Sequence, residues 1–205
     1  MIENISWVFF DIGSTIINEQ SAYEHRFREI AEAAKIPYDN VYQMAVNYYK
    51  QNKKGDLEAA RALEIDLAAW HNEDEVLYDN VPHYLEIVKK KYKIGIIANQ
   101  PFGTAERLEK HGILQYFDLV IASAEEGVAK PDKRIFERAL ERSECKSENA
   151  IMIGDRIDND IVPSKRLGFH TIWVKQGFGQ YWNVSCEEEK PDYTVACLSD
   201  IISFL

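Results

Sequence analysis

Residues 5–13 read ISWVFFDIG, an apolar and aromatic run that ends at an acidic residue and a glycine. A short run of this kind is typical of a buried strand. Five further stretches have the same form, and helical patterns lie between them. We expect these strands at residues 92–98, 119–122, 150–153, 170–174 and 193–196, and the helices at residues 81–91, 104–111, 132–142 and 158–167. Apolar strands that alternate with helices predict a parallel sheet covered on both faces, which is an α/β fold.

One region interrupts this alternation. A crossover between parallel strands needs only about a dozen residues, whereas residues 16–80 contain no strand candidate. Helical patterns fill this stretch, at residues 21–35, 38–54 and 56–70. We therefore predict a doubly wound (Rossmann-like) core formed by residues 1–15 and 81–205, with a small all-helical cap subdomain formed by residues 16–80.

The composition narrows the functional class. The chain has 205 residues, and 46% of them are hydrophobic, which rules out wholesale disorder. A formal net charge of −10 repels nucleic acid and anionic lipid surfaces. Three cysteines without a paired spacing indicate reduced thiols, and no stretch resembles a signal peptide or reaches the ~20 apolar residues of a membrane span. We expect a cytoplasmic monomer or homodimer that binds a small anionic substrate and neither nucleic acid nor a membrane.

Polar side chains follow four of the predicted strands. They are Asp11, Asn99, Ser123 and Asp155. In open α/β sheets ligands bind beyond the carboxyl ends of the strands, so these residues are expected to face one site. Two aspartates at the ends of two strands, beneath a helical insertion, form the candidate functional site.

Four stretches resemble the ordered motifs of the haloacid dehalogenase-like hydrolase superfamily. They read WVFFDIGST (7–15), IIANQ (96–100), VAKPDKRIFERAL (128–140) and IMIGDRIDNDI (151–161). They occur in the family's order, and the insertion lies where the family carries its cap. The resemblance implies a hydrolase, and specifically a Mg²⁺-dependent phosphatase that acts on a small phosphorylated metabolite through an aspartyl-phosphate intermediate.

The resemblance also assigns roles to residues of the site. Asp11 would be the nucleophile, because a metal ion and a lysine can hold an anionic phosphoryl group against a carboxylate. Asp11, Asp155 and the backbone carbonyl of Gly13 would bind Mg²⁺, a hard cation that prefers oxygen ligands. Lys130 would neutralise the charge of the nucleophile and the phosphoryl group, and Asp160 would position Lys130 or a metal-bound water.

Two positions depart from the family pattern. Gly13 stands where phosphatases of the family carry a second aspartate, the general acid and base, which is typically worth about 10²- to 10⁴-fold in rate. Ala98 stands where a threonine or serine of the family normally binds the phosphoryl group. The resemblance implies that the substrate contacts at this strand end would be Ala98 itself and Asn99, the latter through its backbone N–H and its amide. A carboxylate reintroduced by Gly13→Asp is expected to raise the turnover of alkyl phosphates.

Other groups and other chemistries remain open. Glu19, Glu24 or His25, early in the insertion, could replace the missing acid. The five histidines show no ligand spacing. The alternatives to a phosphatase are a catalytically silent binding or regulatory protein, a metal-free dehalogenase, and a phosphonatase that uses a cap lysine as a Schiff base. The candidate lysines for the last are Lys35, Lys50, Lys53 and Lys54.

Overall fold

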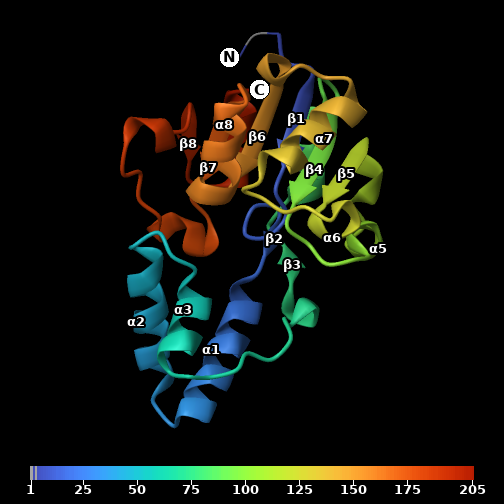
Figure 1. The fold of residues 1–205 in the computed structure, drawn as a ribbon. Helices are drawn as coiled ribbons and strands as arrows, with labels where there is room; N and C mark the ends of the chain where they lie inside the picture. Colours follow the sequence, from blue (N-terminus) through green and yellow to red (C-terminus); the bar gives the residue numbers. More distant parts are fainter. Residues whose placement is uncertain (1, 3) are drawn as a thin grey trace.

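Six parallel strands form the core sheet of the computed structural model, which describes residues 2 and 4–205 (Figure 1). The strands are β1 (Trp7–Phe10), β4 (Lys93–Ala98), β5 (Leu119–Ala122), β6 (Ala150–Gly154), β7 (His170–Val174) and β8 (Tyr193–Val195). Their order across the sheet is β5-β4-β1-β6-β7-β8. The first strand therefore lies inside the sheet and the chain winds outward from it in both directions, which confirms the predicted doubly wound α/β fold.

Both faces of the central strand are buried. Val8 and Phe10 belong to one hydrophobic cluster, while Phe9 belongs to a second cluster on the opposite face. Successive side chains of a strand point to opposite faces, so burial on both sides produces the continuous apolar run seen in the sequence. The first cluster is covered by helices α4 (Val81–Lys89) and α5 (Thr104–Lys110), and the second by α7 (Lys133–Ser143).

Two short helices complete the core. Helix α6 (Ser123–Glu126) follows β5 directly, and α8 (Val162–Arg166) precedes β7. The single helix predicted at residues 158–167 is divided, because a π-helical turn, Ile157–Ile161, comes before α8. No helix among the described residues has the length and apolar character that crossing a membrane requires.

The insertion forms a three-helix unit beyond the carboxyl ends of the strands (Figure 1). Its helices are α1 (Gln20–Ala34), α2 (Tyr38–Tyr49) and α3 (Gly55–Ala62). Two further strands, β2 (Ile17–Asn18) and β3 (Val76–Leu77), pair antiparallel where the chain leaves and re-enters the core. The expectation that residues 16–80 contain no strand is therefore wrong, since strands of two residues are too short to produce an alternating pattern.

Two helices of the insertion end earlier than the sequence predicts. Residue Glu64 has a left-handed backbone (φ 57°), and the N–H of Ile65 donates to the carbonyl of Ala60 at 2.9 Å. This is a Schellman motif, which ends α3 well before residue 70. Helix α2 also ends before residue 54, with Asn52 left-handed at φ 59°. Because the residue in the left-handed position is not glycine at either end, the usual stop signal is missing from the sequence.

A side chain of the core completes the hydrophobic cluster of the insertion. Phe178 lies in a 3₁₀ turn after β7, and its ring centroid is 4.9 Å from that of Tyr23, 5.5 Å from Phe27 and 4.8 Å from Tyr49. Only 3% of Phe178 is exposed. The packing of the insertion therefore depends on a loop of the core.

Removing this ring should destabilise the protein. Phe178→Ala is expected to lower the free energy of unfolding by about 3 to 5 kcal/mol, because it leaves a cavity among aromatic rings. Phe102→Ala is the control, since Phe102 is 77% exposed, and it should change the same quantity by less than about 0.5 kcal/mol. Urea unfolding followed by fluorescence measures both. A loss for Phe178→Ala no larger than the control's would show that the core does not support the insertion in this way.

Candidate active site

The carboxyl ends of three neighbouring strands surround a cavity of about 120 Å³ beneath the insertion. Asp11 follows β1, Asn99 follows β4 and Asp155 follows β6, and all three line the cavity. Lys130 joins them from the loop before α7. The insertion contributes further lining residues, which are Glu19, Tyr23 and Lys54. The structure thus brings Asp11, Asn99 and Asp155 to one site, as predicted. The expectation for Ser123 is wrong: Ser123 does not line this cavity, and its hydroxyl exchanges hydrogen bonds with the backbone of Gln100 at 3.0 and 3.1 Å.

Lys130 lies at the centre of this cluster. Its Nζ atom donates to Oδ1 of Asp11 and to Oδ1 of Asp160, each at 2.6 Å, and to the carbonyl oxygen of Ile97 at 2.9 Å. Only 5% of Lys130 is exposed. Burial disfavours the charged ammonium group, but Asp11 and Asp160 together raise the pKa of Lys130 above its ordinary value. The lysine therefore carries a fixed positive charge in the cavity wall at neutral pH.

The backbone of Lys130 is held by the side chain of Asn99. The amide Nδ2 of Asn99 donates to the carbonyl of Lys130 at 2.9 Å, and the N–H of Lys130 donates to Oδ1 of Asn99 at 2.7 Å. The amide was expected to contact a phosphoryl oxygen, but both of its polar atoms are engaged with the loop that carries the lysine. The backbone N–H of Asn99 stays a prediction as a substrate contact. Ala98 is fully buried, and its methyl group cannot replace a hydroxyl donor.

The acidic residues of the site fit a divalent cation. Carboxylate oxygens of Asp11, Asp155 and Asp160 lie within 4.8 Å of one another. Burial, followed by repulsion from Asp160 and Asp11, raises the pKa of Asp155 well above its ordinary value. A cation between these oxygens would relieve that cost, and Mg²⁺ is a hard ion that takes oxygen ligands. The donor set therefore matches the predicted Mg²⁺ site.

Asp160 is the carboxylate least free to bind an ion. One oxygen accepts from Lys130, and the other accepts from the N–H of Arg156 at 3.0 Å. Its side chain lies against Gly154, where an added Cβ would come within 2.4 Å of the Asp160 carboxyl carbon. Burial raises the pKa of Asp160 in spite of its lysine partner. This arrangement favours Asp11 and Asp155 as direct ligands and leaves Asp160 to hold Lys130, which is the first of the two roles offered for it above.

Glu19 lies against the position that departs from the family pattern. A Cβ added to Gly13 would lie 2.6 Å from Oε1 of Glu19 and 2.8 Å from its Oε2. The hydroxyl of Ser14 donates to Oε2 at 2.9 Å. Burial, with smaller contributions from Glu75 and Asp11, raises the pKa of Glu19 to about 7, against the opposing effects of Ser14 and Lys54. The carboxyl group of Glu19 therefore fills the space next to Gly13 inside the cavity.

The other two candidates for the missing acid lie elsewhere. Glu24 and His25 line a separate cavity on the insertion. Nδ1 of His25 lies 2.8 Å from Oδ2 of Asp74, and Oε2 of Glu24 lies 3.6 Å from Nη2 of Arg28. Of the three groups that the sequence left open, the structure places only Glu19 in the cavity that contains Asp11.

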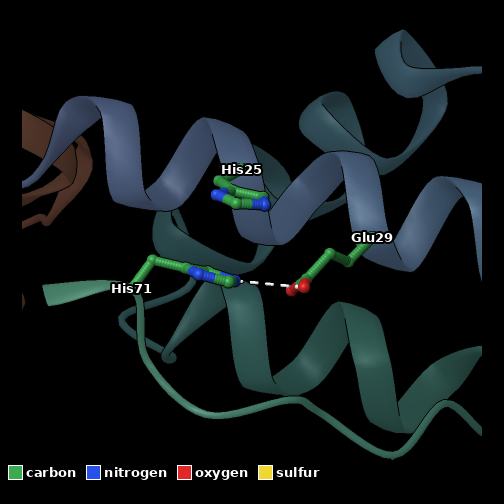
Figure 2. A group of neighbouring side chains, drawn as sticks. All are labelled: His25, Glu29 and His71. Atoms are coloured by element: carbon green, nitrogen blue, oxygen red, sulfur yellow. Dashed lines mark ion pairs between the residues drawn. The ribbon is translucent and has the colours of Figure 1, made fainter. Parts of the chain in front are cut away.

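A second cluster of titratable side chains lies on the insertion, where α1 meets the segment before β3 (Figure 2). Nε2 of His71 is 3.0 Å from Oε1 of Glu29, and the rings of His25 and His71 stack with centroids 3.6 Å apart at an interplanar angle of 10°. His25 and His71 lie far apart in the sequence, so the spacing of the histidines gives no sign of this contact. The nitrogen lone pairs lie in the ring planes, and two nearly parallel planes do not converge on one ion. The cluster is best described as a set of ion pairs that ties α1 to the returning chain.

Comparisons with known proteins identify the family. The sequence profile described as "haloacid dehalogenase-like hydrolase" matches residues 5–168. The chain belongs to the haloacid dehalogenase-like hydrolases. The predicted family and the prediction of a hydrolase are therefore confirmed.

Curated relatives carry phosphatase names. The chain is 27% identical over 228 residues to the glyceraldehyde 3-phosphate phosphatase of Pyrococcus furiosus, in a match that covers 100% of this chain and 94% of the relative. It is 36% identical over 114 residues to the pyrimidine 5′-nucleotidase YjjG of Escherichia coli, with 51% of each chain covered. These relatives support the phosphatase class within the family.

A solved structure shares the fold over the whole length. The putative HAD-hydrolase YfnB from Bacillus subtilis, solved bound to magnesium, superposes with a TM-score of 0.72 and covers 99% of both chains. Its sequence identity to this chain is 20%. At that identity the likeness concerns the fold, and it agrees with the α/β sheet and the helical insertion described above.

The raised pKa of Glu19 makes a prediction about stability. The pKa of Glu19 is about 7 in the folded protein and near 4.5 in the unfolded chain. Between these pH values the side chain therefore takes up a proton on folding, and its contribution to stability falls as the pH rises from about 4.5 to about 7. In Glu19→Gln the side chain cannot ionise. The free energy of unfolding of this variant, relative to that of the wild type, should therefore be about 2 kcal/mol higher at pH 8 than at pH 5. Urea unfolding of both proteins in a metal chelator measures this difference. An advantage that does not change with pH would contradict the raised pKa.

Proposed function

We propose that the chain is a Mg²⁺-dependent phosphatase that acts on a small phosphorylated metabolite through an aspartyl-phosphate intermediate on Asp11. The observation that carries this proposal is the buried Lys130, which bridges Asp11 and Asp160 beside Asp155. An anionic substrate can approach a carboxylate nucleophile only where nearby positive charge offsets the repulsion. The chain as a whole has a net charge of −10, so the positive charge must come from a side chain at the site itself, here Lys130.

The cavities support a small substrate. The cavity above Asp11 measures about 120 Å³, and an adjoining cavity of about 410 Å³ lies toward the insertion. The two share several lining residues, which are Glu19, Tyr23, Lys54, Asn99 and Gln100. A phosphoryl group in the inner cavity would leave its organic part in the outer one. Relatives named glyceraldehyde 3-phosphate phosphatase and pyrimidine 5′-nucleotidase support a substrate of this class.

The proposed reaction has two displacements at phosphorus. An oxygen of Asp11 bonds to the phosphorus as the bond to the leaving oxygen breaks, and water then attacks the phosphorus and frees Asp11. Lys130 offsets the negative charge of both partners, and Asp160 and the amide of Asn99 keep the lysine in place. Mg²⁺ bound by Asp11, Asp155 and the carbonyl of Gly13 would supply further positive charge to the phosphoryl oxygens.

The alternatives make different demands on the site. A dehalogenase without a metal ion has no use for the three clustered carboxylates. A phosphonatase needs a desolvated lysine, but the cap lysine that lines the cavity, Lys54, is exposed. A silent binding protein predicts that Mg²⁺ binds without turnover. The cytoplasmic location and the oligomeric state stay predictions.

Phosphate release is the test of this proposal. Turnover of aryl, acyl and sugar phosphates should depend on Mg²⁺, and Asp11→Asn should lower it by more than about 10³-fold, because the nucleophile is lost. Asp39→Asn is the matched control: Asp39 is exposed in the first turn of α2 and lines neither of the two cavities, so activity should persist. A folded wild type that binds Mg²⁺ but releases no phosphate, or an active Asp11→Asn variant, would overturn the proposal.

A further inference from the structure

The carboxyl group of Glu19 occupies the space that a side chain at position 13 would need. A Cβ at position 13 would lie 2.6 Å from Oε1, 2.8 Å from the carboxyl carbon and 2.8 Å from Oε2 of Glu19. Real Cβ atoms do not approach other heavy atoms so closely. The volume into which a side chain at position 13 would project is therefore occupied by a carboxyl group that arrives from another part of the chain.

The local fold fixes Glu19 in this place. After β1 the carbonyl of Ile12 accepts hydrogen bonds from the N–H groups of Ile16 and Ile17, each at 2.9 Å, and these bonds close a tight turn. Strand β2 follows, and Glu19 is the N-cap residue of α1. The hydroxyl of Ser14 holds one carboxyl oxygen, Oε2, at 2.9 Å. The second oxygen, Oε1, accepts no hydrogen bond from Ser14 and lies 2.6 Å from the position of a Cβ at residue 13.

Each of the other carboxyl groups that line the cavity already has a contact or a proposed role. Asp11 is the proposed nucleophile and Asp155 a proposed metal ligand. Both oxygens of Asp160 are engaged, by Lys130 and by the N–H of Arg156. Lys130 contacts two carboxylates and a carbonyl. Among the carboxyl groups that line this cavity, Glu19 is the one without an assigned role, yet an alkoxide leaving group requires a proton.

We propose that Glu19 is the general acid and general base of this site, an inference that rests on the proposed phosphatase function. As the bond from phosphorus to the leaving oxygen breaks and the Asp11–phosphorus bond forms, the carboxylic acid of Glu19 gives its proton to the leaving oxygen. Its carboxylate then takes a proton from water as the water oxygen bonds to phosphorus and the bond to Asp11 breaks. Phosphate leaves, and both Asp11 and protonated Glu19 are restored. Because Glu19 begins the insertion, the cap would supply this group instead of the first strand.

The dependence of the Glu19→Gln rate on the leaving group distinguishes a catalytic role of Glu19 from a structural one. Glu19→Gln keeps the size of the side chain, and for an alkyl phosphate its kcat should fall by about 10²- to 10⁴-fold. With an aryl phosphate such as p-nitrophenyl phosphate, whose leaving group needs no proton, the first step should proceed. The variant should then release about one equivalent of phenolate in a burst, followed by slow turnover, because the attack of water lacks its base. Glu24→Gln, on the same helix but in a separate cavity, should behave like the wild type.

Moving the carboxylate provides a second measurement. Gly13→Asp alone should fail to raise turnover, contrary to the expectation from the sequence, because the new side chain can enter only by displacing the carboxyl group of Glu19, which already supplies the acid. The double variant Glu19→Ala, Gly13→Asp should turn over an alkyl phosphate at least about 10-fold faster than Glu19→Ala alone. A double variant no more active than Glu19→Ala would count against the inference.

The outcomes distinguish the two proposals. If the wild type shows no Asp11-dependent phosphate release, the proposed function fails. If the wild type is active and Glu19→Gln turns over alkyl phosphates equally well, only the role of Glu19 is overturned. An equal loss for alkyl and aryl phosphates, without a burst, would also overturn it, since that result indicates a structural role.

Discussion

The active site is organised around a lysine that is buried between two carboxylates. Charges that are removed from water are tolerated only when they are paired with good geometry, and the two 2.6 Å contacts of Lys130 meet that condition. The loss of the lysine would leave both of its carboxylate partners without a compensating charge, typically at a cost of about 3 to 5 kcal/mol. The surrounding residues serve this arrangement: Asn99 holds the lysine's backbone, and Gly154 makes room for Asp160. The same pairing keeps a positive charge beside Asp11.

The core and the insertion are mutually dependent. The core gives Phe178 to the hydrophobic cluster of the insertion, and the insertion places Glu19 and Lys54 in the cavity of the core. Strands β2 and β3 connect the two parts at the carboxyl edge of the sheet. A movement of the helical unit would therefore change the composition of the cavity itself, in addition to its access to water.

The sequence predicted the features that depend on long or ordered patterns. Six apolar runs and the helices between them indicated the parallel sheet, and four motifs indicated the family that the profile match confirms. The early ends of α2 and α3 were missed, because left-handed Asn52 and Glu64 end these helices without a glycine signal. The strands β2 and β3 were missed because two residues cannot show a period.

The finer features of the site depend on contacts that no local pattern reports. The amide of Asn99 was assigned to substrate, yet it binds the backbone of Lys130, which lies 31 positions away in sequence. The stacking of His25 on His71 has the same origin. Glu19 could be named from the sequence only as one of three possibilities. The turn that follows Gly13 and the approach of the Glu19 carboxyl group to this glycine distinguish Glu19 from the others, and both are properties of the folded chain.

The central claim is that a phosphoryl group passes through Asp11 next to Lys130. Its most direct test is a single turnover with a ³²P-labelled phosphate ester in Mg²⁺, stopped with acid and followed by peptide mapping. The account predicts a transient label on the peptide that contains Asp11, and the label should be absent from Asp11→Asn. Turnover of the ester by the wild type without any label on that peptide, or with the label on another residue, would contradict the account.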